Sequence, residues 1–198
     1  MDISILNLSN LSNVAVIVIE ENAEKLSRCI QTFAKNKRNI QIVTNEQSFQ
    51  YYEAFKDVKK TYDSNKYDYV NGSTFVFDDC FAEYDWVKDK KLNDFISYPK
   101  MYGLTTVFGF RDLPALPQRM CWNLDLICIG NNPSVDTREK IYDSFFLYLY
   151  SYDTFCELLD NSTKDNGFLV LRREGTEDKV YVAKCWVYIG TISSYPLM

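Results

Sequence analysis

Two adjacent carboxylates, Asp78 and Asp79, directly follow the apolar segment Thr74–Phe77. Paired carboxylates at the end of a buried strand can hold the shell of a Mg²⁺ ion and polarise a water that attacks a phosphate. The same pattern arises more often where one side chain caps a following helix and an acid lies in its first turn. The pair therefore predicts either a metal-dependent hydrolytic centre or the start of a helix.

A lysine follows another apolar segment at a spacing that can be compared with that of a phosphate-binding loop. The segment that ends at Ile19 leads to Lys25, as a strand leads to the lysine of the loop Gly-x-x-x-x-Gly-Lys-Ser/Thr. With Lys25 aligned in this way, Ile19 and Glu24 stand where the two glycines belong. Leu26 takes the position of the magnesium-binding hydroxyl, and Ser27 lies one residue later.

The replaced glycines and the nearby acids argue against phosphate binding there. Isoleucine and glutamate resist the positive φ that turns backbone N–H groups toward a phosphate. Glu20, Glu21 and Glu24 add three carboxylates, and one like-charge pair at ~4 Å costs about 4 kcal/mol at an effective dielectric of about 20. A micromolar nucleotide site is worth only about 8 kcal/mol. We therefore favour a helix start, with Asn22 as N-cap and Glu24 in the first turn.

The composition excludes several other chemistries. The 198 residues include no histidine, which removes Ser-His-Asp and Cys-His catalysis, HExxH zinc sites and Cys2His2 fingers. The six cysteines form no CxxC pair, so we expect buried, reduced thiols. The net charge of −5 argues against a surface that is basic overall, and the clusters Lys35–Arg38 and Lys88–Lys91 are expected to be solvated helix ends. No signal-peptide pattern and no stretch of about 20 apolar residues occurs, which predicts an intracellular protein without a membrane partner.

The elements that must position these residues follow from the hydrophobic pattern. Continuous apolar runs predict strands buried on both faces, at Val14–Ile19, Ile40–Val43, Thr74–Phe77, Leu104–Phe108 and Leu124–Ile129. Helical spacing alternates with these runs, at Ala23–Lys35, Glu46–Tyr62, Val87–Tyr98, Ala115–Trp122 and Thr137–Leu159. The alternation predicts one α/β domain over 1–198, with a mainly parallel sheet, helices on both faces and a C-terminal antiparallel hairpin at about 167–190.

Three stretches in this order make the chain recognisable. They are Asp78-Asp79-Cys80, then Leu113-Pro114 to Leu116-Pro117-Gln118-Arg119 with Asn123 following, then Phe155 and the stretch from Phe168–Leu171 to Lys179–Tyr181. The chain resembles the poxvirus-type genome-packaging ATPases of large nucleocytoplasmic DNA viruses, a branch of the FtsK–HerA lineage of P-loop NTPases. The resemblance implies a three-layer RecA/FtsK-like P-loop NTPase fold. It also implies descent from ring-forming motors that hydrolyse ATP to push duplex DNA into a preformed shell.

The resemblance also assigns roles to individual residues. In an active member, Asp78, Asp79 and Arg119 would be catalytic, with Asp78 holding Mg²⁺. Lys25, Ser27 and Arg111 would lie at the nucleotide, with Arg111 in place of the family's polar sensor, usually a glutamine. Against this pattern stand the missing glycine-rich loop and the missing histidine of an Arg-His pair.

Three functions remain open at this point. The favoured hypothesis is a catalytically degenerate homologue without a cofactor, acting as a structural or assembly subunit in the virion or packaging complex. Its partners would be viral assembly or capsid proteins, further copies of itself or an active ATPase, with at most weak, non-specific DNA contact, in the viral factory of the host cytoplasm or in the virion. One alternative is an active ATP- and Mg²⁺-dependent packaging motor whose site is atypical or completed by a partner. A second alternative is a protein-interaction module, since the run Phe145–Tyr150 is apolar on all sides.

Overall fold

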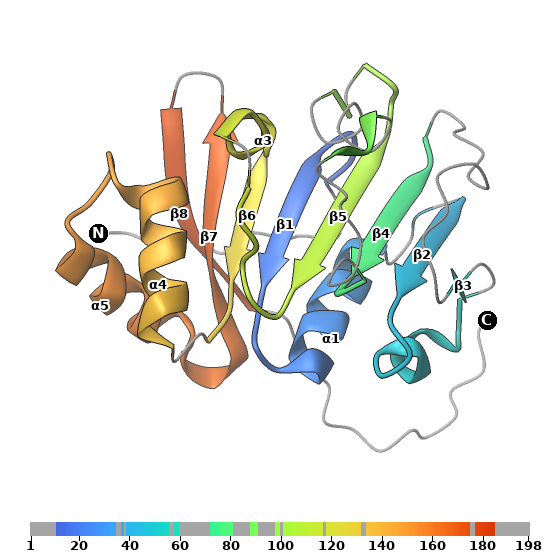
Figure 1. Ribbon diagram of the computed structural model, residues 1–198, viewed down its shortest axis with the longest axis horizontal. Helices are drawn as coiled ribbons and strands as arrows, with labels where there is room; N and C mark the ends of the chain where they lie inside the picture. Colours follow the sequence, from blue (N-terminus) through green and yellow to red (C-terminus); the bar gives the residue numbers. More distant parts are fainter. Residues whose placement is uncertain are drawn as a thin grey trace.

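An eight-stranded sheet forms the centre of the protein (Figure 1). The computed structural model describes residues 11–34, 37, 39–55, 58–59, 72–80, 88–90, 98–99, 101–116, 118–131, 134–174 and 177–184. The strand order is β3-β2-β4-β5-β1-β6-β7-β8, in which all pairs from β3 to β6 are parallel and β6-β7 and β7-β8 are antiparallel. In chain order the strands are β1 (Ala15–Ile19), β2 (Ile40–Thr44), β3 (Val58–Lys59), β4 (Thr74–Asp78), β5 (Thr105–Phe110), β6 (Leu126–Ile129), β7 (Gly167–Glu174) and β8 (Glu177–Lys184).

The register of the parallel strands brings four strand ends to one edge of the sheet. Ile19, the last residue of β1, pairs with Phe110 of β5 on one side and with Ile129 of β6 on the other. Asp78, the last residue of β4, pairs with Gly109 of β5. The residues that follow these strands therefore meet at the carboxyl edge of the sheet, where ligands bind in open α/β folds.

Helices cover both faces of the sheet and make three layers (Figure 1). Alternate strand residues such as Val16 and Val18 face α1 (Ala23–Ala34) and the 3₁₀ helix η2 (Phe49–Tyr52). The intervening residues, such as Ile17, face the helical segments of the C-terminal half. These segments are α3 (Gln118–Asn123), α4 (Val135–Ile141), the π-helical η5 (Tyr142–Phe146) and α5 (Tyr152–Ser162), and the 3₁₀ turn η6 (Lys164–Asn166) precedes β7. Burial on both faces explains why the strands read as continuous apolar runs.

The structure confirms the predicted fold class, the five buried strands and the first helix. The C-terminal hairpin is confirmed for β7 and β8, and residues 185–190 of the prediction lie outside the described residues. The same holds for most of the predicted helix 87–98. The predicted helix Ala115–Trp122 begins later, as α3 from Gln118, because a residue before a proline such as Pro117 is disfavoured in the helical region. No described helix has the length and apolar character needed to cross a bilayer.

Two predicted helices are wrong. In place of a helix over Glu46–Tyr62, the chain forms η2 and then β3, which pairs with β2. The side chain of Asn45 accepts the backbone N–H of Ser48 at 2.8 Å, and such local bonding favours a turn over a continuing helix.

The predicted helix Thr137–Leu159 is divided into α4, η5 and α5. Ser151 has an extended backbone, and its side chain accepts the N–H of Thr154 as the N-cap of α5. A new helix therefore starts after Ser151, and the preceding helix does not continue through it. The apolar run before it is split in exposure: Phe146 is buried and Tyr148 is 94% exposed. The described cysteines are free thiols, of which Cys80 and Cys156 are half-buried rather than buried.

Candidate functional site

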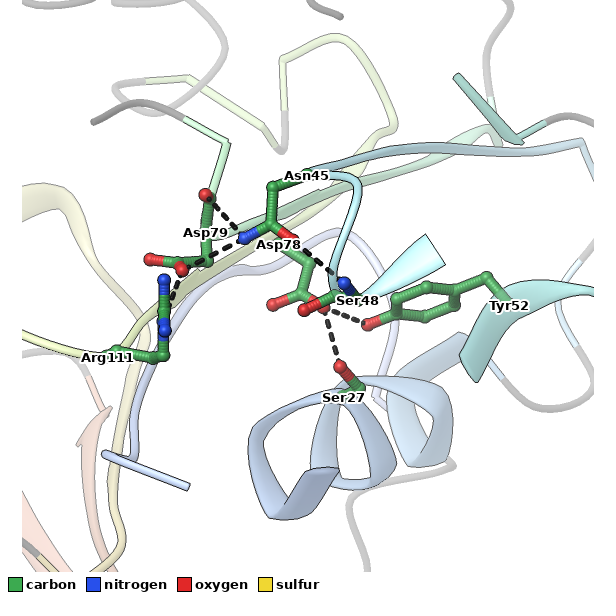
Figure 2. Close-up of polar contacts among 7 residues, drawn as sticks. All are labelled: Ser27, Asn45, Ser48, Tyr52, Asp78, Asp79 and Arg111. Atoms are coloured by element: carbon green, nitrogen blue, oxygen red, sulfur yellow. Dashed lines mark hydrogen bonds and ion pairs between the residues drawn. The ribbon is translucent and has the colours of Figure 1, made fainter. Parts of the chain in front are cut away.

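The candidate site lies at the carboxyl edge of β1, β4, β5 and β6. From β4 and β5 come Asp78, Asp79 and Arg111, and from the start of α1 comes Ser27 (Figure 2). Asn45 and Tyr52 reach the same place from the end of β2 and from η2 (Figure 2). Because β5 lies between β1 and β4, these contacts join segments that are distant in the sequence.

Asp78 is fully buried and is held by two hydroxyl donors. Ser27 Oγ donates to Asp78 Oδ2 at 2.7 Å, and Tyr52 OH donates to the same oxygen at 2.9 Å (Figure 2). The other oxygen, Oδ1, has no hydrogen-bond partner and lies against Gly109, where a Cβ would come within 3.1 Å of it. Burial raises the pKa of Asp78 to about 6, an effect that the two hydroxyl donors oppose. The carboxylate therefore faces α1 and η2 and does not cap a following helix.

Asp79 is bound by a cation and an amide. Its Oδ2 makes an ion pair with Arg111 Nε and accepts a hydrogen bond from Asn45 Nδ2 at 3.1 Å (Figure 2). Asn45 Nδ2 also donates to the carbonyl oxygen of Asp79, at 3.2 Å. The backbone of Asp79 has a φ of 49°, a left-handed conformation that is uncommon for residues other than glycine. Such conformations gather at functional sites, and here the conformation is fixed by contacts to two neighbouring strands.

The turn after β1 has three residues, Glu20, Glu21 and Asn22, before α1 begins. Asn22 is the N-cap, as predicted, because its Oδ1 accepts the N–H of Lys25 at 3.0 Å. Ile19 ends the strand, and Glu24 lies in the first turn of α1, where it pairs with Arg28. The positions aligned with the two loop glycines thus lie in regular secondary structure.

Glu20 was expected only to repel a phosphate, and it is itself a buried residue of this site. It is only 2% exposed, and its two carboxylate oxygens accept the N–H groups of Asn22 at 3.0 Å and Asn131 at 3.1 Å. Burial raises the pKa of Glu20, while the two N–H groups and the charge of Lys25 oppose that rise. One sequence signal could have found it: an acidic residue directly after a strand in which every residue is apolar.

The predicted site residues are only partly brought together. Ser27 contacts Asp78, and Arg111 contacts Asp79. Lys25 is half-buried and acts electrostatically on Glu20. Arg119 lies in α3, which directly precedes β6 (Figure 1). It is therefore at the amino ends of the parallel strands, whereas the other predicted residues are at their carboxyl ends. Within one chain, therefore, the fold does not bring Arg119 to the other predicted residues.

Among the described residues, no group of three or more potential metal ligands converges. Asp78 is the predicted magnesium ligand, and its Oδ2 already accepts hydrogen bonds from Ser27 and Tyr52. Its other oxygen, Oδ1, is buried and has no hydrogen-bond partner.

No protein-family model and no curated protein matches the sequence. Solved structures do match. The genome-packaging NTPase B204 of Sulfolobus turreted icosahedral virus 2, in complex with ATPγS, superposes with a TM-score of 0.57 at 13% identity, over 85% of this chain and 96% of that one. The DNA-packaging ATPase B204 of Sulfolobus turreted icosahedral virus gives a TM-score of 0.58 at 13% identity, over 89% and 98%.

The chain has a P-loop NTPase fold. In a P-loop NTPase fold the phosphate-binding loop joins a strand to the helix that follows it, which corresponds here to the turn from β1 to α1. The Asp78-Asp79 pair stands at the end of β4, which is separated from β1 by one strand. At 13% identity the likeness extends to the fold alone, and membership of the poxvirus-type branch stays a prediction.

Proposed function

We propose that the chain is a catalytically degenerate homologue of viral DNA-packaging ATPases and acts as a structural or assembly subunit in a virion or packaging complex. The observation that carries this proposal is the turn from β1 to α1. Ile19 is in the strand and Glu24 is in the helix, so only three residues are left to wrap a phosphate. These residues do not fit a bound triphosphate, because such loops surround it with several inward-facing N–H groups.

The state of Asp79 supports the same proposal. A carboxylate that activates water must be available to that water. Oδ2 of Asp79 is instead in contact with both Arg111 and Asn45. The proposed protein therefore needs no ATP and no Mg²⁺, and its partners are viral assembly or capsid proteins, copies of itself or an active ATPase. It would work in the viral factory of the host cytoplasm or in the virion, with only weak contacts to DNA phosphates.

Calorimetric titration with ATP, with and without Mg²⁺, tests the proposal. We expect no binding in the low-micromolar range in either condition. Titration with inorganic phosphate and with ADP is run beside it, so that weak binding of anions is separated from recognition of a nucleotide. Low-micromolar affinity for ATP would reject the degenerate function.

An active packaging motor is the second candidate, and the contact between Ser27 and Asp78 favours it. A hydroxyl at the start of a helix beside a strand-end carboxylate is the arrangement that holds Mg²⁺ in P-loop enzymes. Phosphate release by the purified protein, with duplex DNA and candidate partner proteins, measures this activity. If turnover appears and the variant Asp79→Asn retains it, the mechanism that assigns catalysis to Asp79 is wrong.

A protein-interaction module is the third candidate, and an exposed apolar surface favours it. A cavity of about 640 Å³ is lined by residues of α3, of η5 and the turn after it, and of the β7-β8 hairpin. The lining residues include Trp122, Tyr148 and Arg173. Trp122 is 66% exposed and Tyr148 is 94% exposed. Arg172 pairs with the first residue of β6, so this surface lies away from the Asp78 edge of the sheet. Gel filtration tests whether the surface mediates self-association, and a clean monomer would weaken that use of it.

A further inference from the structure

We propose that Glu20 is a built-in anion that takes the place of a bound phosphate in this fold. This inference rests on the proposed function and extends it, because it names the group that occupies the turn between β1 and α1. It implies that this edge of the sheet retains the capacity to hold an oxyanion and that the chain's own carboxylate uses it.

The first observation is the pair of donors that Glu20 engages. Asn22 N–H belongs to the start of α1, and Asn131 N–H belongs to the segment after β6, 111 residues away from Glu20. Each donates to a different carboxylate oxygen, at 3.0 Å and 3.1 Å. Phosphate and carboxylate both present two oxygens on one central atom, so donors arranged for one can serve the other.

The second observation is the space in which the carboxylate lies. A Cβ added to Gly130 would stand 2.0 Å from Glu20 Oε2, which leaves no room for a side chain at that position. Gly130 N–H donates to the carbonyl of Ile19 at 2.8 Å and holds the ends of β1 and β6 together beside the carboxylate. The absence of a side chain at Gly130 therefore allows the carboxylate of Glu20 to lie close to the backbone.

The third observation is the balance of charge. Glu20 is 2% exposed, and the charged groups that act on it are Lys25, which favours its ionised form, and Glu21, which opposes it. Both carboxylate oxygens have an N–H partner, and these donors and Lys25 oppose the effect of burial, which disfavours the ionised form. A second anion, such as the phosphate of a nucleotide, would meet a like charge at the same donors.

Rescue by inorganic phosphate tests the inference. Glu20→Ala removes the carboxylate, Glu20→Gln keeps its size without its charge, and Glu21→Ala makes the same change at the exposed neighbour. Thermal unfolding is followed in phosphate and in chloride at equal ionic strength. We expect Glu20→Ala to be less stable than wild type in chloride and to gain about 2–4 °C in Tm with phosphate. Wild type, Glu20→Gln and Glu21→Ala should show no gain specific to phosphate.

Equal responses of Glu20→Ala and Glu21→Ala to phosphate would overturn the inference. If Glu20→Ala does not fold, the wild-type amide protons decide. The resonances of Asn22 and Asn131 should shift together as Glu20 is protonated, and this shift should be absent in Glu20→Gln. Independent titration of the two amides, or the same titration in Glu20→Gln, would contradict it. ATP hydrolysis by wild type would reject the proposed function, whereas the effect of phosphate on the Tm of Glu20→Ala tests the role of Glu20 separately.

Discussion

Ser27 Oγ and Asp78 Oδ2 are 2.7 Å apart and hydrogen-bonded, although 51 residues separate them in the sequence. The bond joins α1 to the end of β4, while β5 lies between β4 and the strand that leads into α1. Gly109 of β5 makes the approach possible, because a Cβ there would come within 2.5 Å of Ile30 Cδ1 on α1. The position of α1 over the sheet thus depends on a polar contact and on a small residue beneath it.

The hydroxyl of Tyr52 should contribute measurably to stability. Tyr52→Phe removes one of the two donors to a buried carboxylate, so we expect the free energy of unfolding to fall by about 1.5–3 kcal/mol. The matched control is Tyr148→Phe, at a side chain that is 94% exposed, which should change it by less than about 0.5 kcal/mol. Urea unfolding of both variants measures the difference, and equal values would show that the Tyr52 bond contributes nothing.

Asp78 should make stability depend on pH. Burial raises its folded-state pKa to about 6 from 3.8, so the folded protein binds this proton more tightly than the unfolded chain. The carboxyl then favours folding most at low pH, and its contribution falls as the pH rises through this range. Asp78→Asn removes the titration. The stability of wild type minus that of Asp78→Asn should therefore fall by about 1–3 kcal/mol between about pH 4 and 6, and then stay level.

Asp153→Asn, on the exposed surface of α5, is the control for that profile. It reports how the loss of a surface carboxyl alters the same curve. A wild-type minus Asp78→Asn difference that rises over this range would show that the ionised form is the one favoured by folding.

Gly130 and Glu20 should be energetically coupled. Gly130→Ala places a methyl group 2.0 Å from Glu20 Oε2, so we expect it to destabilise wild type by about 1–3 kcal/mol. In a Glu20→Ala background the main collision is gone, and the same substitution should cost less. Denaturant unfolding of the four proteins in this double-mutant cycle gives the coupling, and additive effects would place the two groups out of contact.

Arg111 should matter little for stability. Its side chain is 44% exposed, and exposed ion pairs contribute about 0–1 kcal/mol. Arg111→Gln should therefore leave the free energy of unfolding within about 1 kcal/mol of wild type. In the same samples we expect no ATP turnover. Turnover in Arg111→Gln alone would identify Arg111 as the group that blocks the reaction.

Local sequence signals predicted the features that depend on nearby residues. Asn22 was predicted as an N-cap because its partner, the N–H of Lys25, is three residues away. The buried strands were predicted because burial on both faces leaves an uninterrupted apolar run, as in β1. The region around Tyr52 was predicted wrongly, because its spacing suits a helix while pairing of β3 with β2 determines the outcome.

The contacts within the site could not be predicted in the same way. The role of Glu20 depends on Asn131, and nothing in the local sequence places that N–H beside it. The pairing of Asp79 with Arg111 depends on β5 lying next to β4. The predicted parallel sheet indicated that these strand ends lie at the same end of the sheet, and the resemblance to a known family assigned them their roles.

The central position of β1 has a consequence for the order of folding. Both of its neighbours come late in the chain: Ala15 pairs with Thr106 in β5, and Val16 pairs with Leu126 in β6. During synthesis on the ribosome, β1 therefore emerges long before either strand that can hydrogen-bond to it. Pairings of such sequence separation form slowly, which exposes an apolar strand during translation and makes the nascent N-terminal half a candidate for chaperone binding.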